Sequence, residues 1–124
     1  MRLELPSLAL IQPSAAAQCI AAFVEALILS NREYLRTHLT PPLYSCGVTY
    51  KESDEWLDIP AILKRRAGDC KSLVAWRVAE LRNTRREALL QVSLMCEGGF
   101  HVSIRKLVKG AVQDEDPSRF LGMR

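Results

Sequence analysis

The spacing of apolar residues changes once in the second half of the chain, and this change limits the folds that the sequence can adopt. Between Cys70 and Arg82 apolar residues recur at i, i+3, i+4, i+8 and i+11, which is typical of a helix with one buried face. These residues are Cys70, Leu73, Val74, Val78 and Leu81. After Asn83-Thr84 apolar residues occupy every second position as far as Cys96, which is typical of a half-buried strand.

Two further strands are predicted downstream. Phe100, Val102 and Ile104 alternate with polar residues, and residues 111–113 form a short third strand. Gly98-Gly99 and Lys109-Gly110 are the predicted turns between the three strands. Strands joined by such short turns indicate an antiparallel meander.

The first half of the chain is predicted to be mostly helical. Good helix formers continue from residue 14 to about Arg36, and Pro41-Pro42 follow. Residues 56–66 have the composition of a second helix that stops before Gly68, while residues 44–50 permit a strand or an ordered loop. Helices followed by a meander predict an α+β fold, with the N-terminal helices packed on one side of a small antiparallel β-sheet.

The length of the chain limits the number of domains, and its net charge limits the partners that the sequence indicates. A chain of 124 residues, 48% of them hydrophobic, can bury one core and leaves no room for another, so residues 1–124 are predicted to be a single domain. The net charge of +3 is too small to indicate nucleic acid or a membrane as a partner. The basic residues 64–66 and 82–86 are interpreted as solvated helix ends, with a nucleic-acid footprint as the alternative.

The cysteine spacing does not match a metal site or a dithiol. The chain has four cysteines: Cys19, Cys46, Cys70 and Cys96. None forms a CxxC pair, so neither a metal nor another cofactor is expected. Glu4 and Pro6 interrupt the apolar N-terminus, which argues against an export signal, and residues 15–29 are shorter than the ~20 apolar residues of a membrane span. A cytosolic location with reduced thiols is therefore expected.

Cys70 is the strongest candidate for chemistry because it directly follows Gly68-Asp69 at the predicted start of a helix. Free N–H groups and the positive end of the helix dipole favour a thiolate at such a position. A thiolate there would be a nucleophile. The alternative is a small apolar residue that belongs to the buried face of the helix.

A cysteine nucleophile needs a base, and the chain has only two histidines. His38 lies at the end of the first predicted helix, where an exposed role is favoured. His101 lies near the start of a strand, on a polar face, so the helix of Cys70 would have to meet the strand at that same terminus to bring Cys70 close. Of the acidic residues 114–116, Asp116 is the best candidate to orient the ring, because Pro117 restricts its backbone to an extended conformation; a solvated acidic turn is the alternative.

The motifs around these three residues resemble those of the transglutaminase-like cysteine-protease superfamily. They are RAGDCKSLVA at 66–75, GFHV at 99–102 and EDPS at 115–118. The small versions encoded in tailed bacteriophages and prophages are more similar still, because they join a Gly-Asp-Cys helix start to a closing DPSRxLGM, here residues 116–123. The resemblance covers about residues 50–123. This chain differs from the family in having Lys71-Ser72 where an acidic residue often follows the cysteine.

The resemblance implies a papain/transglutaminase-like core and a Cys-His-Asp triad. In that triad Cys70 is the nucleophile, His101 the general base and acid, and Asp116 the orienting carboxylate. The implied activity is amide hydrolysis, proteolysis or acyl transfer on a protein or peptide substrate. The alternative is a catalytically silent virion or tail-assembly protein with the same fold. Both imply the bacterial host cytoplasm or the virion as location, and other phage virion or tail proteins as partners.

Two questions about supporting residues follow from the sequence. Arg77 lies on the apolar stripe of its helix and is predicted to form an ion pair between helix and sheet, since an unpaired buried guanidinium is costly. The oxyanion donor is the backbone N–H of Cys70 together with an unassigned side chain. Tyr44, Tyr50 and Trp56 lie upstream and are the candidates.

Overall fold

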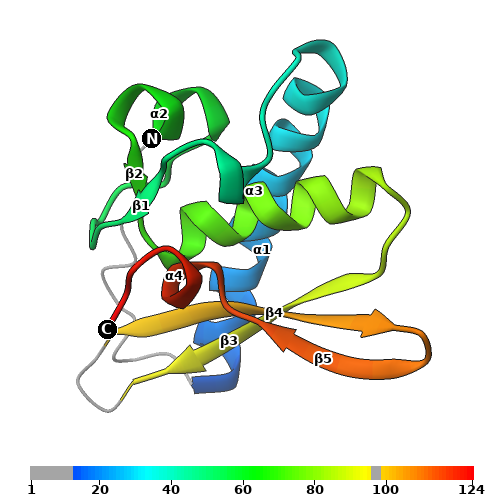
Figure 1. Cartoon of the computed structure of the whole chain (residues 1–124). Coiled ribbons are helices and arrows are strands. Elements are labelled where there is room, and N and C mark those ends of the chain that lie inside the picture. The colour runs from blue at the N-terminus through cyan, green and yellow to red at the C-terminus, as the bar shows by residue number, and fades with distance from the viewer. Residues whose placement is uncertain (1–12, 96–98) are drawn as a thin grey trace.

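The computed structural model describes residues 13–95 and 99–124 (Figure 1). The predicted lead-in at residues 1–12, the end of the predicted strand at Cys96 and Gly98 of the predicted turn lie outside these residues. In chain order the elements are α1 (Pro13–Thr37), the 3-10 helix η2 (Leu43–Ser45), β1 (Thr49–Tyr50), α2 (Ile59–Arg65), β2 (Ala67–Gly68), α3 (Cys70–Asn83), β3 (Ala88–Leu94), β4 (Phe100–Val108), β5 (Ala111–Glu115) and α4 (Pro117–Phe120).

The three C-terminal strands form the predicted antiparallel meander in the order β3-β4-β5. Leu90 is paired with Ile104 and Val92 with Val102, which places the apolar residues of both strands on one face. The β4–β5 pairing runs from Val108 back only to Ile104. Residues 100–103 of β4 therefore pair with β3 alone, and their other edge is open to elements outside the sheet.

The helices α1 and α3 cover the apolar face of this sheet (Figure 1). Their buried residues form one core with the inward residues of β3 and β4, including Ile20, Val24, Val74, Val78 and Ile104. The structure is therefore an α+β fold with helices on one side of a small antiparallel sheet, as predicted from the periodicity.

The prediction that α3 has one buried face is wrong, because ten of its 14 residues are buried. One side of the helix packs against α1 and the sheet. The other side packs through Leu73 and Trp76 into a second core with Leu43, Ile59 and Ile62. This second core is built by the segment between α1 and α3, whose contacts the spacing of apolar residues within α3 does not reveal.

A small parallel pair of strands leads into α3. Tyr50 of β1 is paired with Gly68 of β2, two residues before Cys70. A side chain at Gly68 would place its Cβ 3.2 Å from Leu73 Cδ2, so glycine allows β2 to pass close to the helix. At the opposite end of the chain, α4 lies beside the first residues of β4 and the N-terminal end of α3 (Figure 1).

Within residues 13–95 and 99–124, no helix combines the length and apolar character that crossing a membrane requires.

Candidate active site

Cys70 is the first residue of α3, and the preceding residue caps the helix. The Asp69 side chain accepts a hydrogen bond from the Ser72 backbone N–H at 3.3 Å, as an N-cap residue does. The Cys70 residue is only 7% exposed and belongs to the core formed by α1, α3 and the sheet. The fold thus places a thiol at a helix N-terminus but withdraws it from water.

Burial raises the pKa of the Cys70 thiol above its usual range, and the nearby Asp69 carboxylate raises it further. Backbone N–H groups of Val102 and Lys71, together with the Lys71 ammonium, act in the opposite direction without reversing the shift. The expectation that the helix start favours a thiolate is therefore wrong for this protein. The dipole effect is smaller than the cost of placing a charged sulfur in the core.

His101 and Asp116 lie in direct contact. The Nε2–H of His101 donates to Oδ2 of Asp116 at 2.7 Å, and both side chains are 21% exposed. Because Nε2 is used by the carboxylate, Nδ1 is the ring nitrogen available as a base. The other oxygen of Asp116, Oδ1, faces the backbone N–H of Arg119 at 3.5 Å as the N-cap of α4. One carboxylate thus orients the imidazole and begins the last helix.

The sulfur of Cys70 lies at the open edge of β4. The backbone N–H of Val102, the residue after His101, is one of the two backbone donors that face the sulfur. Contact between α3 and the start of β4 is the arrangement expected from the polar face on which His101 lies. Among the hydrogen bonds of the described residues, none joins the Cys70 thiol to the His101 ring.

Of the three upstream candidates for an oxyanion donor, Tyr50 is the one that lies near Cys70 and Asp116. Its backbone N–H donates to the carbonyl of Leu121 at 3.0 Å, which ties β1 to the end of α4. Burial raises the pKa of the Tyr50 hydroxyl, and the charges that Cys70, Asp69 and Asp116 carry when ionised add to this shift. Tyr50 therefore lies within electrostatic reach of both the thiol and the orienting carboxylate.

The other two upstream candidates are occupied elsewhere. The hydroxyl of Tyr44 donates to Glu115 Oε2 at 2.5 Å. The Trp56 ring is buried and lies beneath the Lys71 ammonium, 5.4 Å from it. Of the three candidates for an oxyanion donor, Tyr50 is the one that remains.

Lys71, which follows Cys70 where the family that this chain resembles often has an acidic residue, is a buried structural residue. Its ammonium pairs with the Asp69 carboxylate and donates to the carbonyl of Ser53 at 2.9 Å. The Lys71 and Asp69 side chains are only 4% and 6% exposed. Asp69 and Lys71 flank Cys70 in the sequence, and through the bond to Ser53 they connect the segment before α2 to the N-terminus of α3. The sequence contained the two residues but no signal that they are buried together.

Glu115 anchors the end of β5, and the prediction of an ion pair for Arg77 is confirmed there. Arg77 Nε donates to Glu115 Oε2 at 2.6 Å, and Lys106 Nζ donates to Oε1 at 2.7 Å. Arg77 also pairs with Glu80 on its own helix and lies over the ring of Tyr44. We call Glu115, Arg77, Lys106 and Tyr44 the Glu115 cluster.

His38 is not part of this arrangement. Its ring stacks on Tyr34 with a centroid distance of 4.1 Å, and Nδ1 lies 2.9 Å from the Thr37 hydroxyl at the exposed end of α1. In the part of the chain that the structure describes, no three His, Cys, Asp or Glu side chains gather to hold a metal ion.

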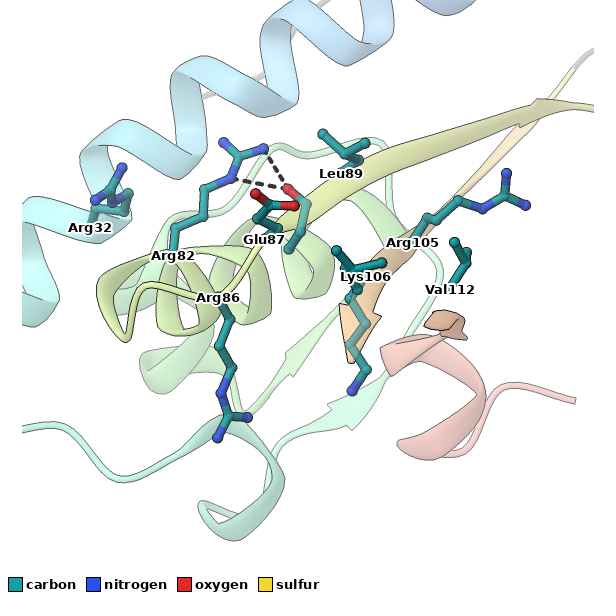
Figure 2. A pocket seen from close by; sticks show the side chains of 10 residues that line it. Arg32, Arg82, Arg86, Glu87, Leu89, Arg105, Lys106 and Val112 are labelled. Atoms are coloured by element: carbon teal, nitrogen blue, oxygen red, sulfur yellow. Dashed lines mark hydrogen bonds between the residues drawn. The ribbon is translucent and has the colours of Figure 1, made fainter. Parts of the chain in front are cut away.

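A groove of about 630 Å³ lies away from these residues, between α1, the C-terminal end of α3 and the sheet end formed by the start of β3 and the end of β4 (Figure 2). None of the three candidate catalytic residues lines it. Figure 2 shows Arg82 donating to the backbone carbonyl of Ala88, and the same guanidinium pairs with Glu25 at 2.6 Å. Two more of the cationic residues that line the groove, Arg105 and Lys106, pair with acids of β5. The prediction that Arg82 belongs to a solvated helix end is therefore wrong, because its guanidinium is paired within the fold.

The structure thus joins His101 to Asp116 and brings Cys70 to the backbone of the residue after His101. Comparisons of the chain with protein-family models, curated proteins and solved structures found no match.

Proposed function

We propose that this protein is a transglutaminase-like thiol enzyme of the phage type, in which Cys70, His101 and Asp116 form the catalytic triad. The observation that carries the proposal is the 2.7 Å hydrogen bond from His101 Nε2 to Asp116, next to the strand edge where Cys70 lies. It leaves Nδ1 as the base on the same strand segment that contacts the sulfur. A helix that begins with a cysteine and packs on an antiparallel meander also supports a papain/transglutaminase-like core.

The proposed reaction has two stages. The Cys70 sulfur attacks the carbonyl carbon of an amide while His101 Nδ1 takes the thiol proton. The carbon–nitrogen bond breaks, Nδ1 returns the proton to the leaving amine, and a thioester remains on Cys70. Water or a second amine then attacks the thioester, passes a proton to His101, and the thiolate of Cys70 recovers it. Water gives hydrolysis or proteolysis, and an amine gives acyl transfer.

The raised pKa of Cys70 indicates the protonation state of its thiol before substrate binds. Because burial disfavours the thiolate, the resting enzyme holds a neutral Cys70 thiol in place of a preformed thiolate–imidazolium pair. The proton then moves during attack, which requires Nδ1 to reach hydrogen-bond distance of the sulfur once substrate is bound. Asp116 favours this step because its carboxylate stabilises the imidazolium that forms.

The oxyanion of the tetrahedral intermediate needs donors close to the thiol. The Asp69 side chain accepts a hydrogen bond from the backbone N–H of Ser72, and the Asp69 backbone carbonyl accepts one from the N–H of Leu73. The backbone N–H of Cys70, in the first helical turn, has no intrahelical acceptor and is one proposed donor. The Tyr50 hydroxyl is the second.

The proposed substrate is a protein or peptide amide, and the phage resemblance points to other virion or tail proteins. The place of action is then the bacterial host cytoplasm or the virion. A catalytically silent assembly protein is the second candidate, and the neutral, buried Cys70 thiol is the observation that favours it.

Acylation by p-nitrophenyl acetate separates the two candidates. Cys19 is exposed and Cys46 half-buried, whereas Cys70 is buried, so reactivity governed by access alone would leave Cys70 the slowest of these three. Peptide mapping by mass spectrometry should instead find the acetyl group on Cys70 first, and Cys70→Ala should abolish the fast phase. Acetylation in the order of exposure would contradict the enzyme and support the silent protein. Adding methylamine to the acyl-enzyme then distinguishes acyl transfer from hydrolysis by the product formed.

A further inference from the structure

The carboxylate of Glu115 is held by three donors that come from three different elements. Arg77 on α3 and Tyr44 on η2 both bind Oε2, at 2.6 and 2.5 Å, and Lys106 on β4 binds Oε1 at 2.7 Å. The Glu115 side chain is only 14% exposed. Hydrogen bonds between charged groups are short and strong, so this side chain has little freedom to move.

The electrostatics of the Glu115 cluster are consistent with a permanently ionised anchor. Burial on its own would raise the pKa of the Glu115 carboxyl, but the bonds from Arg77, Lys106 and Tyr44 outweigh it and lower the pKa to about 2. The pKa of the Tyr44 hydroxyl is raised by burial and by its bond to the carboxylate, so it remains a donor. The cluster therefore keeps its charges and hydrogen bonds throughout the neutral pH range.

The position of Glu115 in the chain connects this anchor to the candidate active site. Glu115 is the last residue of β5, and the next residue is Asp116. The backbone of Asp116 is extended, with φ −124° and ψ 92°, as expected before Pro117. With Glu115 fixed on one side and Pro117 on the other, the direction of the Asp116 side chain has few alternatives.

The same cluster reaches the helix that carries the nucleophile. Arg77 lies on α3, seven residues after Cys70, which is about two helical turns. Its guanidinium thus links α3 to the strand end from which Asp116 projects. The distance between the helix of Cys70 and the carboxylate that orients His101 depends on this link.

We propose that Glu115 is a positioning residue for the triad, which holds Asp116 in the place where its carboxylate meets His101 Nε2. This role rests on the proposed function, because it assigns Glu115 to the site of that reaction without contact to substrate. A purely stabilising role would be shared by any equally buried acid that binds Arg77.

Glu80 provides the matched control for that distinction. It binds Arg77 at 3.1 Å, and its side chain is 15% exposed, almost the same as that of Glu115. It also accepts hydrogen bonds from Trp76 and from the backbone of Leu43. Glu80 is thus a comparably buried acid of the same arginine that is not adjacent to Asp116.

The test is the ring N–H resonance of His101 in proton NMR of the folded full-length chain, compared among wild type, Glu115→Gln and Glu80→Gln. A ring proton donated to a carboxylate exchanges slowly with water and gives a separate downfield signal, which His101→Asn and Asp116→Ala assign. Glu115→Gln should speed its exchange by about tenfold or more, because the hydrogen bond to Asp116 is made for less of the time. Glu80→Gln should leave the exchange rate unchanged, even where thermal melts show a similar loss of stability.

Two outcomes overturn the proposal: an unchanged His101 signal in folded Glu115→Gln, or an equal change in Glu80→Gln. Should Glu115→Gln fail to fold, Tyr44→Phe removes one donor to the same carboxylate and should accelerate exchange to a smaller extent. An unchanged exchange rate in Tyr44→Phe then counts against the role. The His101 signal and the acylation of Cys70 are separate readouts, and the proposed function itself fails if wild-type protein with an intact His101 signal is not acylated at Cys70.

Discussion

The imidazole of His101 and the carboxylate of Asp116 are 15 residues apart in the chain and 2.7 Å apart in space. Two structural features produce this contact: β5 stops pairing with β4 at Ile104, and α4 begins at the next residue but one after the last paired position. Asp116 lies in this short gap, where its side chain can cap the helix and bind the ring together. The contact thus follows from where β5 ends.

Asp116→Asn tests the orienting role without removing the helix cap, because Asn is as good an N-cap as Asp. The amide can no longer stabilise an imidazolium or keep the ring in the required tautomer. The rate of Cys70 acylation by p-nitrophenyl acetate should fall by about 1,000-fold or more. Chemical unfolding should show stability close to that of wild type; an acylation rate that is also unchanged would contradict the role.

The stability of the protein should depend on pH through Cys70. Burial raises the pKa of the folded thiol, so the unfolded chain ionises first, at about pH 8.5. The contribution of the neutral thiol is complete below that pH and is lost as the pH rises towards the folded pKa, by at most about 1.4 kcal/mol per pH unit. Urea unfolding between pH 8 and about 9.5 should show this slope in wild type and not in Cys70→Ser. Equal slopes in the two proteins would show that the thiol is not buried in its neutral form.

Lys71→Met should destabilise the protein by about 3–5 kcal/mol, because it leaves the buried Asp69 carboxylate without its partner. The double variant Asp69→Asn, Lys71→Met removes both charges and keeps a capping residue before Cys70. It should regain a large part of the lost stability. A double variant less stable than Lys71→Met in urea unfolding would argue against the buried pair.

Tyr50→Phe should lower the acylation rate of Cys70 by about 100-fold, the usual cost of losing one oxyanion donor. Its stability should change little, because Tyr50 is only partly buried and its hydroxyl is the only group removed. Tyr34→Phe, on α1 beside His38, is the matched control and should acylate at the wild-type rate. Equal rates for Tyr50→Phe and wild type would remove Tyr50 from the site.

Much of the fold follows from local patterns in the sequence. The spacing of apolar residues predicted α3 to within one residue and predicted the first two strands of the meander, because both depend on which residues face the core. The third strand was predicted from the turn at Lys109-Gly110, and most of its residues are exposed. The parallel pairing of β1 with β2 was not predicted, since each strand has only two residues and carries no period. The burial of α3 on both sides was missed for a related reason: its second partner is the irregular segment that contains η2.

The contact between His101 and Asp116 was predictable from the sequence, whereas the electrostatics of Cys70 were not. The pairing of His101 with Asp116 was predicted from the extended backbone before Pro117 and from the family resemblance, whereas the direction of the Cys70 pKa shift depends on burial of the thiol in the core that α1, α3 and the sheet form together. An arginine on an apolar stripe was enough to predict an ion pair for Arg77. It could not identify Glu115, because that acid lies 38 residues further along the chain.

The central claim is that the His101 ring activates a buried thiol. The most direct measurement is the rate of acetylation of Cys70 relative to Cys19 at pH 7, in wild type and in His101→Asn, by peptide mapping at early times. Cys70 should react before the exposed Cys19 in wild type, and His101→Asn should reverse this order. A ratio that is the same in both proteins would contradict the activation of Cys70 by His101.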